Sequence, residues 1–140
     1  MDKKNGFVFA AVGQVHSSLK ERTGAPRQAW DGAPGATVEI YPDFVDAVEG
    51  INPGAQVWIL TCLHQADRSV LKVRPRGCMD NPLTGVFATR SPDRPNPIGL
   101  HRATVLALDE GRWLRVEGLE AIDGTPVLDV KPVLPQNGGS

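Results

Sequence analysis

The sequence alternates short apolar runs with turn-forming residues, a pattern typical of a small β protein. The clearest run is Val57–Leu63, whose almost wholly apolar composition indicates a central strand covered on both faces. Phe7–Val15 is rich in β-branched and aromatic residues and predicts a first strand. Only Pro42–Gly50 has apolar residues at helical spacing, and it ends on a glycine that is typical of a helix stop. We therefore expect strands with one short helical turn.

Six shorter segments predict further strands. Ala103–Leu108 and Arg112–Glu117 flank Asp109-Glu110-Gly111, a three-residue connection that is typical of a β-hairpin. In the second of these strands, Leu114 and Val116 are expected on the buried side. The other four predicted strands are Thr37–Ile40, Val70–Val73 at a sheet edge, Val86–Thr89 and Val127–Val130.

Turn signals are spread along the whole chain and favour a barrel. The 140 residues include 15 glycines and 12 prolines, where an average composition would give roughly 17 of the two together. The pattern lacks long helices between the strands, which disfavours a doubly wound α/β sheet. We expect a mainly β fold, a small antiparallel β-barrel that is closed or nearly closed. The length predicts a single domain over residues 1–140, structured over about 6–135, with 136–140 as a frayed tail.

Composition places the chain among ordinary globular proteins, with 41% hydrophobic and 22% charged residues. The sequence has no apolar run long enough to span a bilayer, and its first residues lack the pattern of a secretory signal. We therefore expect a cytoplasmic protein that does not associate with a membrane. Cys62 and Cys78 form no CxxC pair and no Cys/His cluster, so neither a metal site nor a disulfide framework is predicted.

Charge is unevenly distributed along the chain. The formal net charge is −1 and the pI is about 6.3, which argues against a dedicated duplex-binding protein. Residues 68–102 nevertheless hold seven basic side chains against two acidic ones. A basic segment on an acidic body suits a protein that meets an anion with one face. The basic residues are Arg68, Lys72, Arg74, Arg76, Arg90, Arg94 and Arg102.

Four polar segments contain more chemistry than packing requires, and Gly85–Leu100 is the most specific of them. Three prolines within six residues of this segment fix the backbone and remove hydrogen-bond donors. Arg90, Ser91, Arg94 and Asn96 are therefore presented on a stiff loop, which loses little entropy when a ligand binds.

Two further segments combine polar groups that suit an anionic or nucleotide-like ligand. Pro26-Arg27-Gln28 offers a planar cation and an amide, unless it is simply an exposed loop. His64-Gln65 directly follows the apolar run, where polar residues commonly line a pocket mouth. His64 is a hydrogen-bonding group, a titrating base or a structural histidine. His16 and His101 show no partner pattern and are expected to be structural.

The fourth segment, Asp123–Pro126, opens with a turn dipeptide that directs backbone groups and a carboxylate outward. The alternative is that the segment is simply a tight turn. It is followed by a predicted strand on which Asp129 and Lys131 share a face. The chain contains no GxGxxG, Walker P-loop, HExxH or GxSxG motif, which removes the common routes to nucleotide binding and hydrolysis.

Taken together, these segments resemble the TsaA-like, or TrmO, family of β-barrel methyltransferases, over about Gly6 to Pro135. The resemblance implies a small, usually dimeric β-barrel that binds S-adenosylmethionine without a Rossmann fold. It also implies a tRNA partner, because characterised members methylate N6 of threonylcarbamoyladenosine beside the anticodon. The residues that carry it are Pro26-Arg27-Gln28, Trp58-Ile59-Leu60 with His64-Gln65, Gly85–Ser91 with Arg94–Gly99, and Asp123–Pro132.

The resemblance also implies which residues form the site. The S-adenosylmethionine contacts would be Arg27, Gln28, His64, Gln65, Arg90, Leu100, Asp123, Gly124, Thr125 and Pro126. The residues implied to hold the RNA substrate are Arg94, Asn96 and Lys131. Asp129 and Asp123 are our candidates for the general base. These types fit the ligand, since its carboxylate requires a cation, its positive groups require oxygens and its adenine requires apolar walls.

Departures from the family pattern leave three functions open. Val133 follows Lys131-Pro132 where tyrosine is usual, and His101 stands where serine is common. Larger members carry a further C-terminal domain, so RNA affinity is expected to be weaker here or the substrate to differ. We predict a tRNA-modifying methyltransferase that acts as a homodimer. The alternatives are a methyltransferase of a small anionic metabolite and a non-catalytic S-adenosylmethionine-binding module.

Overall fold

The computed structural model describes residues 6–20, 35–75 and 78–135. Two 3₁₀ helices of this part of the chain are η2 (Pro42–Val48) and η4 (Val86–Ala88). No helix of these described residues is long and apolar enough to cross a membrane. The strands are β1 (Gly13–His16), β2 (Ala36–Ile40), β3 (Gln56–Cys62), β4 (Lys72–Val73), β5 (Thr84–Gly85), β6 (Ile98–Asp109), β7 (Trp113–Glu117) and β8 (Pro126–Pro132).

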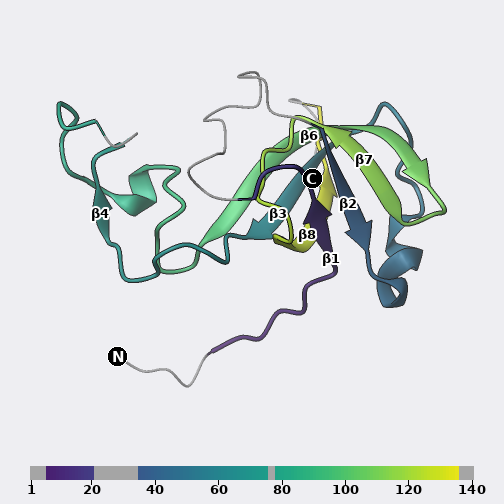
Figure 1. The fold of residues 1–140 in the computed structure, drawn as a ribbon, viewed down its shortest axis with the longest axis horizontal. Coiled ribbons are helices and arrows are strands. Elements are labelled where there is room, and N and C mark those ends of the chain that lie inside the picture. Colours follow the sequence, from purple (N-terminus) through teal and green to yellow (C-terminus); the bar gives the residue numbers. More distant parts are fainter. Residues whose placement is uncertain (1–5, 21–34, 76–77, 136–140) are drawn as a thin grey trace.

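Six of the strands form a ring of antiparallel neighbours in the order β1-β2-β7-β6-β3-β8 (Figure 1). The ring closes because β8 pairs with β3 along most of its length and also with β1, through Gly13↔Val127 and Gln14↔Pro126. The predicted mainly β, antiparallel, closed or nearly closed fold with a short helical turn is confirmed. The predicted hairpin is confirmed as β6–β7, and its turn residues Glu110 and Gly111 have positive φ angles of 53° and 72°.

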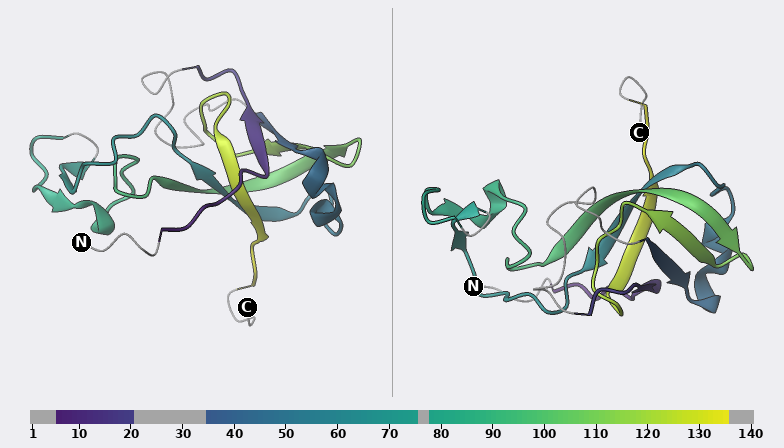
Figure 2. Two further views of the ribbon diagram at one scale, coloured as in Figure 1. Left: turned by 90° about the horizontal axis from the view of Figure 1, so that it is seen from below. Right: turned by 45° about the horizontal axis from the view of Figure 1, so that its top comes forward.

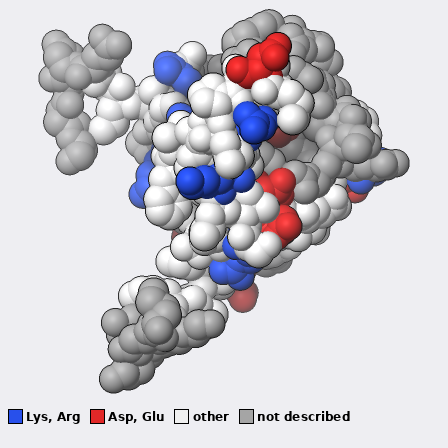
Figure 3. Space-filling model, turned by 90° about the vertical axis from the view of Figure 1, so that its left-hand side faces the viewer, with Lys and Arg blue, Asp and Glu red and all other residues white. Residues whose placement is uncertain are grey.

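Residues 63–97, which we call the arm, connect β3 to β6 and project from the ring (Figures 1 and 2). Within the arm, β4 pairs with β5 in a separate two-stranded sheet, so the predicted strand at 70–73 is not an edge of the main sheet. Figure 3 shows several Lys and Arg side chains at this end of the molecule, with Asp and Glu side chains beside them.

Two strand predictions are wrong, each for a local reason. Phe7–Val15 becomes a strand only from Gly13, and Phe7, Val8 and Phe9 are 82%, 99% and 75% exposed. β propensity alone does not form a strand where no neighbour pairs with it. Val86–Thr89 is instead η4, because the backbone N–H and hydroxyl of Thr89 both donate to the Val86 carbonyl, at 3.0 and 2.9 Å.

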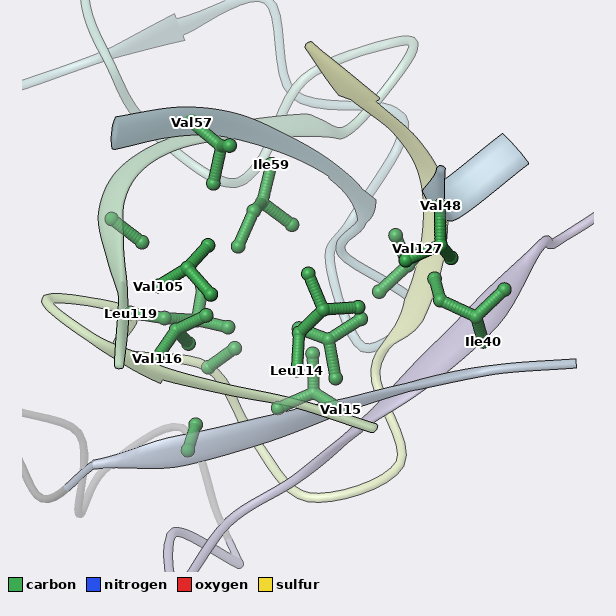
Figure 4. Packing of buried hydrophobic residues seen from close by; sticks show 14 residues of the cluster. Val15, Ile40, Val48, Val57, Ile59, Val105, Leu114, Val116, Leu119 and Val127 are labelled. Atoms are coloured by element: carbon green, nitrogen blue, oxygen red, sulfur yellow. The ribbon is translucent and has the colours of Figure 1, made fainter. Parts of the chain in front are cut away.

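The core fills the ring with aliphatic side chains that alternate along each strand (Figure 4). Leu114 and Val116 of β7 are 1% exposed, as the hairpin pattern predicts. Gly13 allows β1 to approach β2 closely, since a Cβ on it would overlap the Glu39 carbonyl oxygen and lie 3.2 Å from the Ile40 Cα. Backbone atoms cannot move aside as a flexible side chain could, so the ring requires glycine here.

We predict that Gly13→Ala lowers the free energy of unfolding by about 1–3 kcal/mol, the usual range for overpacking. Gly85→Ala is the matched control, because its Cβ would meet no atom within 4 Å and its φ is −60°. Denaturant unfolding should show a change within about 0.5 kcal/mol for the control. Equal stability of the two variants would contradict the close approach of β1 and β2.

Candidate functional site

Part of the site predicted from the sequence lies at one end of the ring. β3 ends at Cys62, which pairs with Ile98 at the start of β6. The residue before it, Thr61, pairs with Val127 near the start of β8. β1 ends at this same end, because it runs antiparallel to β8. The arm is closed at its base by Leu63, whose N–H donates to the Pro97 carbonyl at 2.8 Å. His64-Gln65 and Asp123–Pro126 therefore leave the ring at one end, and Leu100 lies near the start of β6 at the same end. Arg27 and Gln28 lie outside the described residues.

The turn at Asp123–Pro126 is anchored to the end of β1. The N–H of Gly124, whose φ is 85°, donates to the Val15 carbonyl at 2.7 Å. Thr125 is 2% exposed and donates from its hydroxyl to the Ile122 carbonyl at 2.6 Å. The second residue of this turn has a left-handed backbone conformation, which glycine adopts without strain, and this explains Gly124.

The Asp123 carboxylate is held by two donors from the segment that follows β1. Its Oδ1 accepts from the Ser17 backbone N–H at 2.9 Å, and its Oδ2 accepts from the Lys20 ammonium at 3.0 Å. These hydrogen bonds, with the Ser17 contribution the largest, lower the pKa of Asp123. A lowered pKa keeps Asp123 ionised and makes it a weaker base.

Asp129 and Lys131 lie together on the outer face of β8, as the strand pattern predicts. Their side chains are 52% and 62% exposed, and the Lys131 ammonium is 3.2 Å from the Asp129 Oδ2. A β-bulge separates the Leu60↔Asp129 pair from the Thr61↔Val127 pair and directs both charged residues outward. Their assigned roles as base and RNA contact stay predictions.

Arg94, predicted to bind RNA, is hydrogen-bonded to three carbonyls of the arm. Its Nη1 donates to Thr89 and Ser91, both at 3.0 Å, and its Nη2 donates to Val86 at 2.8 Å. The guanidinium therefore braces the loop that presents Arg90. In this way Arg94 has a structural role that the sequence pattern did not reveal, and its contact with RNA stays a prediction.

Arg90 and Asn96 are presented on the outside of this loop. Arg90 is exposed, and its guanidinium has no hydrogen bond or ion pair among the described residues. Asn96 accepts a hydrogen bond at 3.3 Å from Arg68, which also donates to the Pro95 carbonyl at 2.8 Å. Of these two predicted contacts, Arg90 is the one with a cation that remains available for a ligand.

A buried polar pair beneath the site was not predicted from the sequence. Thr61, which is fully buried, and His101 point into the ring with the Thr61 Oγ1 2.9 Å from the His101 Nε2. Gly99 lies beside them, and a Cβ there would overlap the Thr61 hydroxyl and lie 2.8 Å from the His101 ring. Burial lowers the pKa of His101 to about 4. The sequence contains Gly99 as a signal of this close packing. That signal can be interpreted only once the register of β3 and β6 places Gly99 opposite Thr61.

Comparisons with known proteins give a consistent picture. The family described as the tRNA-methyltransferase O N-terminal domain matches residues 14–137. A "Probable S-adenosyl-L-methionine-binding protein" of Methanothermobacter thermautotrophicus is 45% identical over 121 residues, covering 86% of this chain and 85% of the relative. An "S-adenosyl-L-methionine-binding protein" of Archaeoglobus fulgidus is 35% identical over 130 residues, covering 93% of this chain and 91% of the relative.

Solved structures agree with the sequence comparison. A crystal structure of TrmO from Pseudomonas aeruginosa superimposes with a TM-score of 0.73 and 35% identity, covering 93% of this chain and 57% of that chain. Another Pseudomonas aeruginosa relative is 43% identical over 134 residues, and the match covers 91% of this chain and 55% of the relative. The chain thus spans little more than half the length of these two proteins.

We predict that His101 makes the protein less stable as the pH falls from about 6.5 to about 4. The folded state resists protonation of His101, whereas the unfolded chain binds the proton with a pKa near 6.5. The loss across this window approaches roughly 3 kcal/mol, at about 1.4 kcal/mol per pKa unit. Denaturant unfolding at a series of pH values measures it. His101→Ser should flatten the slope, whereas the control His64→Ser, which removes an exposed histidine, should keep it. Equal slopes for His101→Ser and the wild type would contradict the assignment.

Proposed function

Because this chain belongs to the family of the tRNA-methyltransferase O N-terminal domain, we propose that it is an S-adenosylmethionine-dependent methyltransferase that methylates N6 of threonylcarbamoyladenosine beside the tRNA anticodon. The observation that carries the proposal is the meeting of three separate motif segments at one end of the ring, with the basic arm rooted there. The names of the relatives support the cofactor, and the name of the family supports tRNA as the substrate.

The described residues fit such a ligand. The free guanidinium of Arg90 suits the carboxylate of the cofactor, because paired charges of this kind form short, strong hydrogen bonds. Leu100, which is 43% exposed on β6, offers an apolar surface to its adenine. The backbone of the turn at Asp123–Pro126 and the side chains of His64 and Gln65 supply polar groups from the other two segments.

When bound, S-adenosylmethionine supplies a methyl group on a positively charged sulfur, which a nucleophile must approach in line. The residues of the chain then have two tasks, to hold the target nitrogen in position and to accept its proton. Both carboxylates accept a backbone N–H and pair with a lysine, but the Asp129 side chain is 52% exposed and the Asp123 side chain only 35%, so Asp129 is the more accessible to a substrate. We propose Asp129 as the general base on this ground.

A cytoplasmic homodimer is also part of the proposal. Its support is a set of exposed apolar side chains outside the ring, among them Phe7, Val8, Met79 and Phe87, which are 82%, 99%, 77% and 85% exposed. A second copy of the chain would cover them.

We predict that the protein transfers a labelled methyl group from S-adenosylmethionine to tRNA bearing threonylcarbamoyladenosine. Arg90→Ala should weaken cofactor binding about tenfold or more, since a hydrogen bond between charged groups contributes roughly 1.5–3 kcal/mol. Titration calorimetry measures this, with Lys72→Ala as the control because it removes another exposed cation of the arm.

The same assays separate the alternative functions. Cofactor binding without transfer to any tRNA would favour a binding module. Transfer to a small anionic metabolite, with no tRNA shift that weakens steeply with salt, would favour the metabolite enzyme. An unchanged dissociation constant for Arg90→Ala would remove Arg90 from the site.

We predict that Phe87→Ser shifts the protein toward the monomer in sedimentation equilibrium, because it replaces an apolar contact of the proposed interface with a hydroxyl. Leu106→Ser is the control, since Leu106 is 51% exposed but lies on β6 outside the arm. A wild-type protein that is monomeric at all concentrations would contradict the dimer.

A further inference from the structure

The outer face of the sheet has an aromatic side chain between two cations. In the register of the ring, Trp58 of β3 is paired with Arg102 of β6 on one side and with Lys131 of β8 on the other. These three side chains face outward, because the flanking Val57 and Ile59 are buried in the core. We call these three residues the Trp58 row. It runs across β6, β3 and β8, with Lys131 near the end of β8.

The Trp58 row is held in place before any ligand binds. The Arg102 guanidinium carbon lies 5.8 Å from the centroid of the Trp58 ring, and the Arg102 Nη2 donates to the Gln56 Oε1 at 2.6 Å. Trp58 is half-buried, so packing fixes one side of its ring. A preorganised stack of this kind loses little conformational entropy on binding.

A second Trp–Arg stack on the other side of the ring shows what distinguishes the Trp58 row. There, the Arg112 guanidinium lies 4.6 Å from the Trp113 ring centroid but is also 3.1 Å from the Glu39 carboxylate. That carboxylate neutralises the cation within the fold. Arg102, by contrast, has no acidic partner among the described residues, and its charge faces solvent. Of the two Trp–Arg stacks among the described residues, the Trp58 row is therefore the one with an uncompensated cation.

This combination fits an unpaired nucleotide. Bases stack on aromatic rings and on arginine planes, and each phosphate pairs with a cation. Lys131 is 62% exposed at the other end of the row, although Asp129 shares its charge. A protein or lipid partner would need a broader apolar surface than one half-buried ring, so an RNA strand is the partner that this chemistry favours.

The position of the row agrees with the proposed reaction. Leu100, the predicted cofactor contact, is two residues from Arg102 on the same face of β6, a spacing of about 7 Å. The arm, which joins β6 at Ile98, carries further exposed Lys and Arg side chains (Figure 3). We propose that the Trp58 row is the platform on which an unpaired nucleotide of the RNA substrate stacks beside the methyl-donor site. This inference rests on the proposed function and names its RNA-contacting surface.

Fluorescence anisotropy with a labelled RNA hairpin that has an unpaired loop tests the proposal. Arg102→Ala should weaken binding about tenfold, in the range found when one stacked base loses its partner. It should also reduce the slope of log affinity against log salt by roughly 0.7, the value for one contact to a single strand. Arg102→Lys should restore the slope but not the full affinity, because lysine keeps the charge and lacks the plane.

Matched variants on the other side of the ring are the controls. Arg115→Ala also removes an exposed cation from the sheet, and Trp113→Phe makes the same exchange as Trp58→Phe. Trp58→Phe should weaken loop binding, whereas both controls should leave it unchanged. A blunt duplex of the same stem, which has no unpaired base, should bind the wild type and Arg102→Ala with similar affinity.

Three outcomes would overturn the inference. The first is an equal RNA affinity of Arg102→Ala and Arg115→Ala. The second is the absence of any binding to the hairpin. The third is that Arg102→Ala converts a dimer to a monomer while its RNA affinity is unchanged. The last result would mean that a second copy covers the row. Calorimetry with S-adenosylmethionine alone tests the proposed function separately, because Arg102→Ala should bind it as the wild type does. A wild type that fails to bind it would refute that function, whatever the RNA result.

Discussion

Antiparallel pairing of four neighbouring strands is the constraint on which the candidate site depends. In such pairing, the end of one strand lies beside the start of the next. β3 therefore ends where β6 and β8 begin, and β1 ends beside the start of β8. Segments that are distant in the sequence leave the ring together, while aliphatic side chains fill its interior. The core holds the segments in place without taking part in their chemistry, so residues of the site can vary at little cost to the fold.

The arm has a fixed shape although most of its large apolar side chains are exposed. Val86 is 3% exposed, but Leu71, Leu83 and Phe87 are all more than half exposed. Its stiffness comes instead from prolines and from arginines that donate to backbone carbonyls, as Arg94 does. A neutral carbonyl fixes a guanidinium without cancelling its charge. The arm therefore keeps its positive potential while few of its arginines are free to move toward a ligand.

Local patterns predicted the ring well and the site only in part. The run Val57–Leu63, the hairpin and the helical turn depend on neighbours in the sequence, so the sequence shows them directly. The exposure of the segment at Phe7 and the helix at Val86 depend on the hydrogen-bond partners of their backbone groups. The alternation of apolar and polar residues does not encode those partners. The Trp58 row and the anchoring of Asp123 by Ser17 join residues far apart in the chain. Such contacts require the register of the sheet, and a single sequence does not give it.

The bulge between Leu60 and Thr61 explains how one strand serves both the core and the outer surface. Without it, strict alternation from the buried Val127 would turn Asp129 and Lys131 inward. Burial of that ion pair would cost several kcal/mol for each charge. With one extra residue in β8, Val127 and Val130 both contact the core, and the charged pair faces solvent. The bulge thus allows β8, which begins at the anchored Asp123 turn, to place Lys131 beside Trp58. It therefore connects the proposed cofactor site with the Trp58 row.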